Sequence, residues 1–152
     1  MQDIRNDAAR LSLLHDLGVI SANEVVRWAD DLIVSEAKPC QELIDLSTSS
    51  AKGVGDALRS LARGADVWLP IEAALPRILE FVTAKPDQAP IAARAFYHIA
   101  VVQKYEMPKT LRFFLNAEDD FDLAESGIYR FDEVYHRFVD AIRAAIAAYG
   151  VA

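Results

Sequence analysis

The sequence is poor in cysteine and has no apolar run long enough to cross a membrane. Its 152 residues include one cysteine, Cys40, which excludes an internal disulfide framework and a cysteine-rich zinc site because both need several thiols. The longest apolar stretches, such as residues 91–102, are interrupted by charge and are shorter than the about 20 residues that span a bilayer. Residues 1–7 also lack the pattern of a signal peptide. We therefore expect a cytoplasmic protein that is not embedded in a membrane.

Basic residues are the second deficit. The chain has 16 Lys and Arg against 23 Asp and Glu, which gives a formal net charge of −7. Much of the excess lies in residues 117–152, with 8 acidic and 3 basic side chains. Such a surface repels phosphate backbones, so direct nucleic-acid binding is not expected. A basic protein partner fits the charge better.

What the chain does have is apolar residues at helical spacing, while alternating β-branched runs are nearly absent. No stretch has linker-like composition. We predict an all-α fold, a single-domain irregular helical bundle of about seven or eight helices over residues 1–152. The clearest start is Ser21, which has capping-box spacing to Glu24. Predicted helix starts lie at Asp3, Ser21, Pro39, Ser50, Asp66, Asp87, Pro108 and Asp132.

Three further expectations concern individual segments. Pro76 falls inside an apolar helical pattern, which predicts a kink or two short helices there. Trp28 and Trp68 lie within such patterns and are assigned to the core. Residues 117–126 either continue the helix that starts at Pro108 or form a separate acidic helical turn before Gly127.

The sequence contains no recognisable catalytic, nucleotide-binding or metal-binding motif. Its three histidines are far apart, and none belongs to an HExxH pair. We therefore predict no catalytic residue, no metal site and no cofactor. One alternative stays open, in which His98, with Tyr97 and Tyr105 nearby in sequence, meets a carboxylate in a pocket of an enzyme or small-ligand binder.

A run of acidic residues near the C-terminus is the candidate partner-binding site. It lacks the alternating ligands and central glycine of an EF-hand loop, so calcium binding is not favoured. Two interpretations remain, a solvated acidic face and a partner-binding patch. The candidate residues are Glu118, Asp119, Asp120, Asp122 and Glu125.

Two stretches carry a family resemblance: residues 18–33 (GVISANEVVRWADDLI) with residues 42–47 (ELIDLS), and residues 119–129 (DDFDLAESGIY). The first resembles the opening of small bacterial proteins found among immunity proteins of polymorphic-toxin and contact-dependent inhibition systems. This resemblance implies a cytosolic protein that binds and blocks a cognate toxin domain without chemistry of its own. The main alternative is a self-associating structural or regulatory subunit.

Overall fold

The computed structural model describes residues 2–150, and within them the chain is helical and has no β-strand. This part of the chain has eight α-helices and two short 3₁₀ helices, so the predicted all-α class and number of helices are confirmed. None of these helices is long and apolar enough to cross a membrane. The elements are α1 (Gln2–Asp16), α2 (Ala22–Ser35), α3 (Gln41–Ser47), α4 (Val54–Leu61), α5 (Trp68–Ala84), η1 (Pro86–Gln88), α6 (Ala89–Val102), η2 (Lys109–Leu111), α7 (Phe114–Glu125) and α8 (Phe131–Tyr149).

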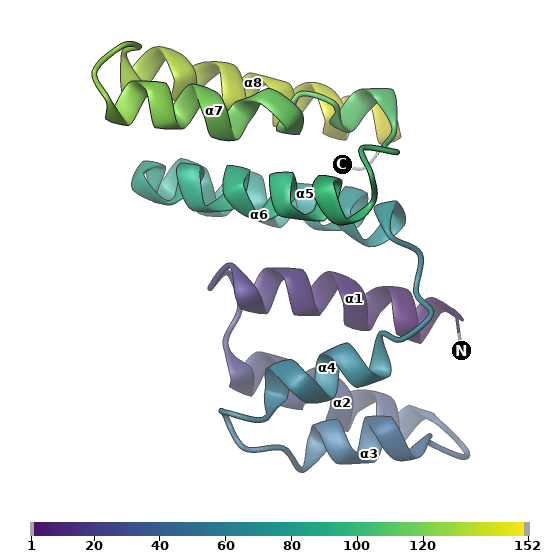
Figure 1. Cartoon of the computed structure of the whole chain (residues 1–152). Coiled ribbons are helices and arrows are strands. Elements are labelled where there is room, and N and C mark those ends of the chain that lie inside the picture. Colours follow the sequence, from purple (N-terminus) through teal and green to yellow (C-terminus); the bar gives the residue numbers. More distant parts are fainter. Residues whose placement is uncertain (1, 151–152) are drawn as a thin grey trace. The chain divides into compact units, whose positions relative to one another are not determined.

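The helices fall into two compact units, residues 1–74 and residues 75–152, with the boundary inside α5. In the first unit α4 packs against α1 and α3, and α2 packs against α3 and α4 (Figure 1). Its fully buried side chains include Leu14, Val25, Leu43 and Leu58. The sequence predicts that both units belong to one domain, and unfolding experiments can test this prediction.

The second unit is built around a cluster of phenylalanines. Helix α7 packs between α6 and α8, and Figure 1 shows α7 and α8 running side by side as a helical hairpin. The Phe114 ring stacks on Phe96 with 3.8 Å between centroids and meets Phe138 edge-on at 5.9 Å. Tyr135 of α8 also donates a 3.0 Å hydrogen bond to the carbonyl of Val82 in α5. This core fixes α7, which carries the candidate acidic residues.

Two helix starts follow the local rules of capping. The Ser21–Glu24 capping box is present, since Ser21 N donates to Glu24 Oε2 at 2.7 Å and Glu24 N donates to Ser21 Oγ at 3.2 Å. At the start of α5, Asp66 Oδ1 accepts hydrogen bonds from the amides of Trp68 and Leu69, both at 2.8 Å. The predicted caps at Ser21 and Asp66 are confirmed.

Loss of the Asp66 cap gives a first testable prediction. Asp66→Ala leaves two amides of the first turn of α5 without their acceptor, and we expect the free energy of unfolding to fall by about 1 kcal/mol. Urea unfolding followed by circular dichroism measures the change. Asp66→Asn is the matched control, because asparagine caps about as well as aspartate. Equal stability of Asp66→Ala and wild type would contradict the assigned cap.

Helix α5 decides between two alternatives, and the tryptophans differ from the prediction. The sequence predicted a kink or two short helices at Pro76, and since α5 runs without interruption through Pro76, two short helices are excluded. Proline costs about 3 kcal/mol inside a helix, but burial of flanking residues such as Leu75 and Ile78 offsets that cost. Trp28 and Trp68 are only half-buried, so their assignment to the core is wrong. Each is a large ring with part of its surface left in solvent.

The chain after α6 differs as well. Lys104 and Tyr105 both have positive φ angles, 54° and 61°, which non-glycine residues rarely adopt. They form a left-handed turn just after the end of α6. Pro108 is followed only by the single 3₁₀ turn of η2, and α7 starts separately at Phe114. The predicted cap Asp132 lies inside the first turn of α8 instead, with Arg130 at the N-cap position.

Candidate protein-binding surface

Helix α7 distributes the five candidate carboxylates around its axis. With 3.6 residues per turn, Glu118, Asp122 and Glu125 share one side, because they follow i, i+4, i+7 spacing. Asp119 lies farther round on the exposed side, and Asp120 lies toward α8. The five residues therefore share one helix without forming a single patch.

Two carboxylates on the side of α7 that carries Glu118, Asp122 and Glu125 form ion pairs with an arginine of α6. Arg94 Nε lies 3.4 Å from Glu118 Oε1, and Arg94 Nη2 lies 3.8 Å from Asp122 Oδ1. The Arg94 side chain is 64% exposed, so these pairs stabilise the fold by at most about 1 kcal/mol. They orient the acidic side of α7 against the start of α6.

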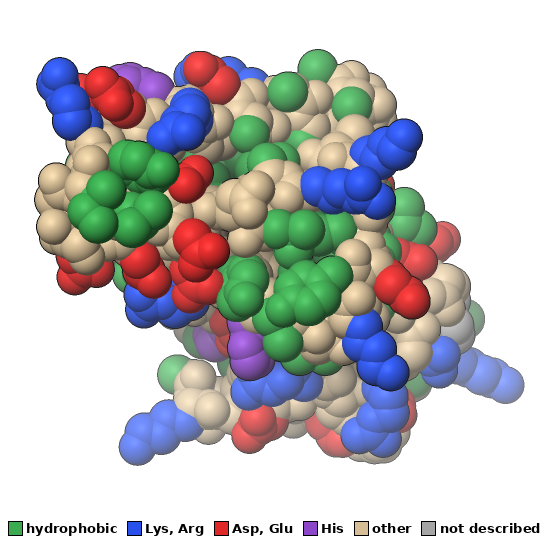
Figure 2. Space-filling model, turned by 45° about the horizontal axis from the view of Figure 1, so that its top comes forward, with side chains coloured by type: hydrophobic (Ala, Val, Ile, Leu, Met, Phe, Trp, Pro, Cys, Tyr) green, Lys and Arg blue, Asp and Glu red, His purple; other side chains and the backbone are tan. Residues whose placement is uncertain are grey.

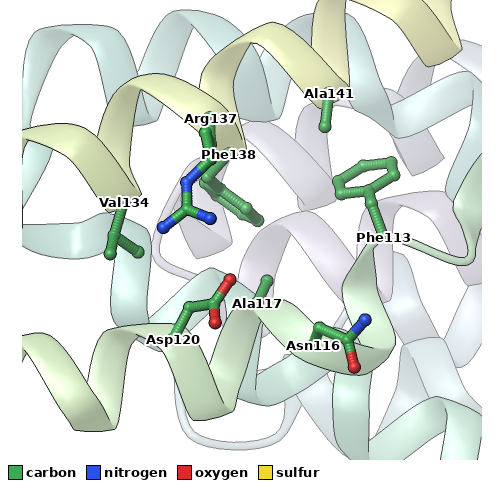
Figure 3. Close-up of a pocket in the computed structure, with 8 residues that line it drawn as sticks. All are labelled: Phe113, Asn116, Ala117, Asp120, Val134, Arg137, Phe138 and Ala141. Atoms are coloured by element: carbon green, nitrogen blue, oxygen red, sulfur yellow. The ribbon is translucent and has the colours of Figure 1, made fainter. Parts of the chain in front are cut away.

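Asp120 belongs to a separate groove between α7 and α8, the α7–α8 groove, with a volume of about 220 Å³. Figure 3 shows the Arg137 guanidinium of α8 pointing toward the Asp120 carboxylate of α7. Arg137 also lies over the ring of Tyr129, 5.8 Å from its centroid. The groove is lined by Phe113, Asn116, Ala117, Asp120, Val134, Arg137, Phe138 and Ala141. Asp120 thus faces a cation of its own chain.

A larger groove, of about 420 Å³, lies on the α6 side of α7, and we call it the α6–α7 groove. Its apolar part includes the rings of Phe121 and Phe131, whose centroids are 5.8 Å apart. Its charged part combines two of the candidate carboxylates with one arginine. The lining residues are Pro90, Arg94, Phe121, Asp122, Ala124, Glu125 and Phe131.

Beside this groove, the connection between α7 and α8 exposes three large apolar side chains. Ile128 is 66% exposed, Tyr129 43% and Phe131 41%, and we call these three residues the α7–α8 tip. The tip follows Gly127, whose φ of 79° lets the chain leave α7 in a left-handed turn. Figure 2 shows hydrophobic side chains with acidic ones beside them on the side where Figure 1 places this connection. Apolar side chains bordered by charge are typical of interaction surfaces.

No family model, curated protein or solved structure matches this chain.

The residues of the enzyme alternative do not come together as that alternative requires. His98 is exposed on α6, and the structure records no ion pair between it and a carboxylate in residues 2–150. Its neighbour Tyr97 forms a hydrogen bond with Tyr105, which raises the pKa of Tyr97; the charges of Tyr105 and of Asp119 and Glu118 raise it further. Within the described residues, no group of three His, Cys, Asp or Glu side chains is placed to hold a metal ion.

Sequence reasoning missed the α7–α8 tip. The only available signal was local, because Ile128, Tyr129 and Phe131 follow Gly127 in a segment that has to connect two helices. Apolar residues in so short a connection have little chance of reaching the core.

Proposed function

We propose that the protein is a non-catalytic, cytoplasmic binding protein that holds a basic protein partner against the α7–α8 tip and the α6–α7 groove. It would act as a stoichiometric inhibitor, in the way that immunity proteins block toxin domains. The observation that carries the proposal is the exposed ring of Phe131 in the same groove as Asp122 and Glu125, with the exposed Ile128 and Tyr129 just before it in the chain. Binding sites combine apolar and aromatic anchors with a charged rim in this manner.

The charge distribution supports a basic partner. The excess of acid over base is largest in the segment that contains α7 and α8, where the tip lies. Glu125 is exposed, and in the described part of the chain it has no ion pair. Complementary charge of this kind raises the association rate about 10- to 1,000-fold at low ionic strength.

A charge-reversal experiment tests the proposal. The tagged protein captures its partner from the cytosol of the source cells, and association with the purified partner is then measured at about 0.1 M and about 1 M salt, where the Debye length is about 10 Å and about 3 Å. We expect Asp122→Lys with Glu125→Lys to slow association at least about 10-fold at the lower salt. The matched control, Asp31→Lys with Glu36→Lys, changes the net charge equally, from −7 to −3 (−7 + 4), but in the first unit.

The control decides between local and global electrostatics. A large effect of the α7 variant with a small effect of the control would support the proposed site. Equal slowing by both variants would show that only net charge matters and would contradict it. If the capture recovers only further copies of this protein, self-association is favoured instead. Its candidate contact residues are the exposed Val101 and Val102 at the end of α6 and Tyr105 just beyond it.

A further inference from the structure

We propose that the α6–α7 groove is the receptor for an arginine side chain of the basic partner, which stacks on Phe131 and pairs with Glu125 and Asp122. This inference rests on the proposed function and names the chemistry of the group that the partner inserts. It concerns one groove, whereas the proposed function concerns the whole surface. The two can therefore fail separately.

The apolar part of the groove suits the stem of an arginine. Pro90 and Ala124 offer aliphatic walls, and the buried Phe121 lies beneath the more exposed Phe131 ring. A long basic side chain buries its methylene groups on such a surface while its charged end stays at the rim. The volume of about 420 Å³ also lies within the range of about 300–1,000 Å³ that is typical of ligand sites.

The charges of the groove select a cation. Asp122 and Glu125 carry two negative charges against the one positive charge of Arg94, and Arg94 is further compensated by Glu118. Glu125 therefore remains available at the edge of the groove. The pairing of Arg94 with Glu118 and Asp122 shows that a guanidinium fits against this side of α7.

The arrangement favours arginine over lysine. The Phe131 ring stacks on Tyr135 with 6.1 Å between centroids and keeps 41% of its surface exposed. A guanidinium is planar, so it can lie against this exposed part of the ring while its forked N–H donors point toward two carboxylates. The lysine ammonium is a compact, strongly hydrated charge that pairs well with one carboxylate but stacks poorly. An acidic or phosphate ligand would meet Asp122 and Glu125 and is disfavoured.

Nuclear magnetic resonance with a small probe tests this without knowledge of the partner. The ¹⁵N-labelled full chain is titrated with N-acetyl-arginine amide, with its neutral analogue N-acetyl-citrulline amide, and with N-acetyl-lysine amide. We expect saturable shifts confined to the amides of the groove, with a Kd of about 1–10 mM for the arginine probe, in line with a free energy near −4 kcal/mol for 1 mM. The citrulline and lysine probes should bind at least several-fold more weakly.

Two conservative variants and one control sharpen the test. Glu125→Gln and Phe131→Leu should each weaken arginine binding several-fold, because one removes a carboxylate and the other removes the aromatic face. Glu133→Gln removes an exposed carboxylate of α8 that does not line the groove, and it should have no effect. Three results would overturn the inference: shifts of amides near carboxylates in both units, equal binding of the three probes, or arginine binding that Glu125→Gln leaves unchanged.

The result separates this inference from the proposed function. If the arginine probe fails to bind while partner capture still depends on salt and on the tip, the arginine site is wrong and the binding function stands. If the probe binds in the groove but no partner depends on Asp122 and Glu125, the groove is an arginine site and the proposed function is wrong.

Discussion

Replacement of Phe114 by alanine is expected to lower the free energy of unfolding by about 3–5 kcal/mol, a large share of the about 5–15 kcal/mol that stabilises an ordinary domain. Phe114 is 1% exposed and stacks on Phe96. Its removal leaves a cavity among α6, α7 and α8, and it also deletes three aromatic contacts, with Phe96, Phe113 and Phe138, worth about 0.5–1.5 kcal/mol each beyond area burial. The matched control is Phe131→Ala, since that ring is 41% exposed and should cost much less.

Two signals in one urea titration make this measurement informative. Circular dichroism follows all helices, whereas fluorescence follows Trp28 and Trp68, the chain's two tryptophans, which both lie in the first unit. If both transitions of Phe114→Ala move to lower urea together, the chain unfolds cooperatively as the predicted single domain. If fluorescence stays in place, the two units unfold separately. A variant as stable as wild type by both signals would contradict the proposed core.

The features predicted from the sequence were those set by local physics. The apolar spacing of the helices and the caps at Ser21 and Asp66 depend on residues within one or two turns, so one sequence contains all the needed information. The same reasoning was insufficient where longer-range packing decides. It left a kink and two short helices open at Pro76, which lies inside the single helix α5, and it placed Trp28 in the core although Trp28 is only half-buried.

The candidate site was predicted only in part. Its position on a helix near the C-terminus follows from local sequence, because residues 118–125 precede Gly127. Its geometry depends on partners distant in sequence. Arg94 of α6 compensates Glu118 and Asp122, and Arg137 of α8 faces Asp120, so the acidic run divides between two grooves. No spacing rule within α7 reveals which helix covers which side.

Loss of the apolar tip is expected to have the largest effect on function. Ile128→Asp with Phe131→Asp should raise the Kd for the captured partner about 100-fold or more, because apolar and aromatic anchors at an interface centre are worth about 2 kcal/mol or more each. The two added carboxylates would attract a basic partner more strongly. Any weakening must therefore come from the lost apolar contacts, which separates this variant from the charge reversal.

A matched control again lies in the first unit. Val34→Asp with Leu69→Asp replaces two exposed apolar residues, 88% and 55% exposed, and adds the same two negative charges. It should leave the Kd within about twofold, or lower it slightly through electrostatic attraction. Circular dichroism of both double variants checks that each retains its helices.

The most direct test of the binding surface is the Kd of the purified one-to-one complex, measured by titration calorimetry for wild type and these two double variants. The proposed surface predicts that the tip variant binds about 100-fold more weakly while the control binds like wild type. If the tip variant binds as tightly as wild type, the partner contacts another face and the proposed surface is wrong.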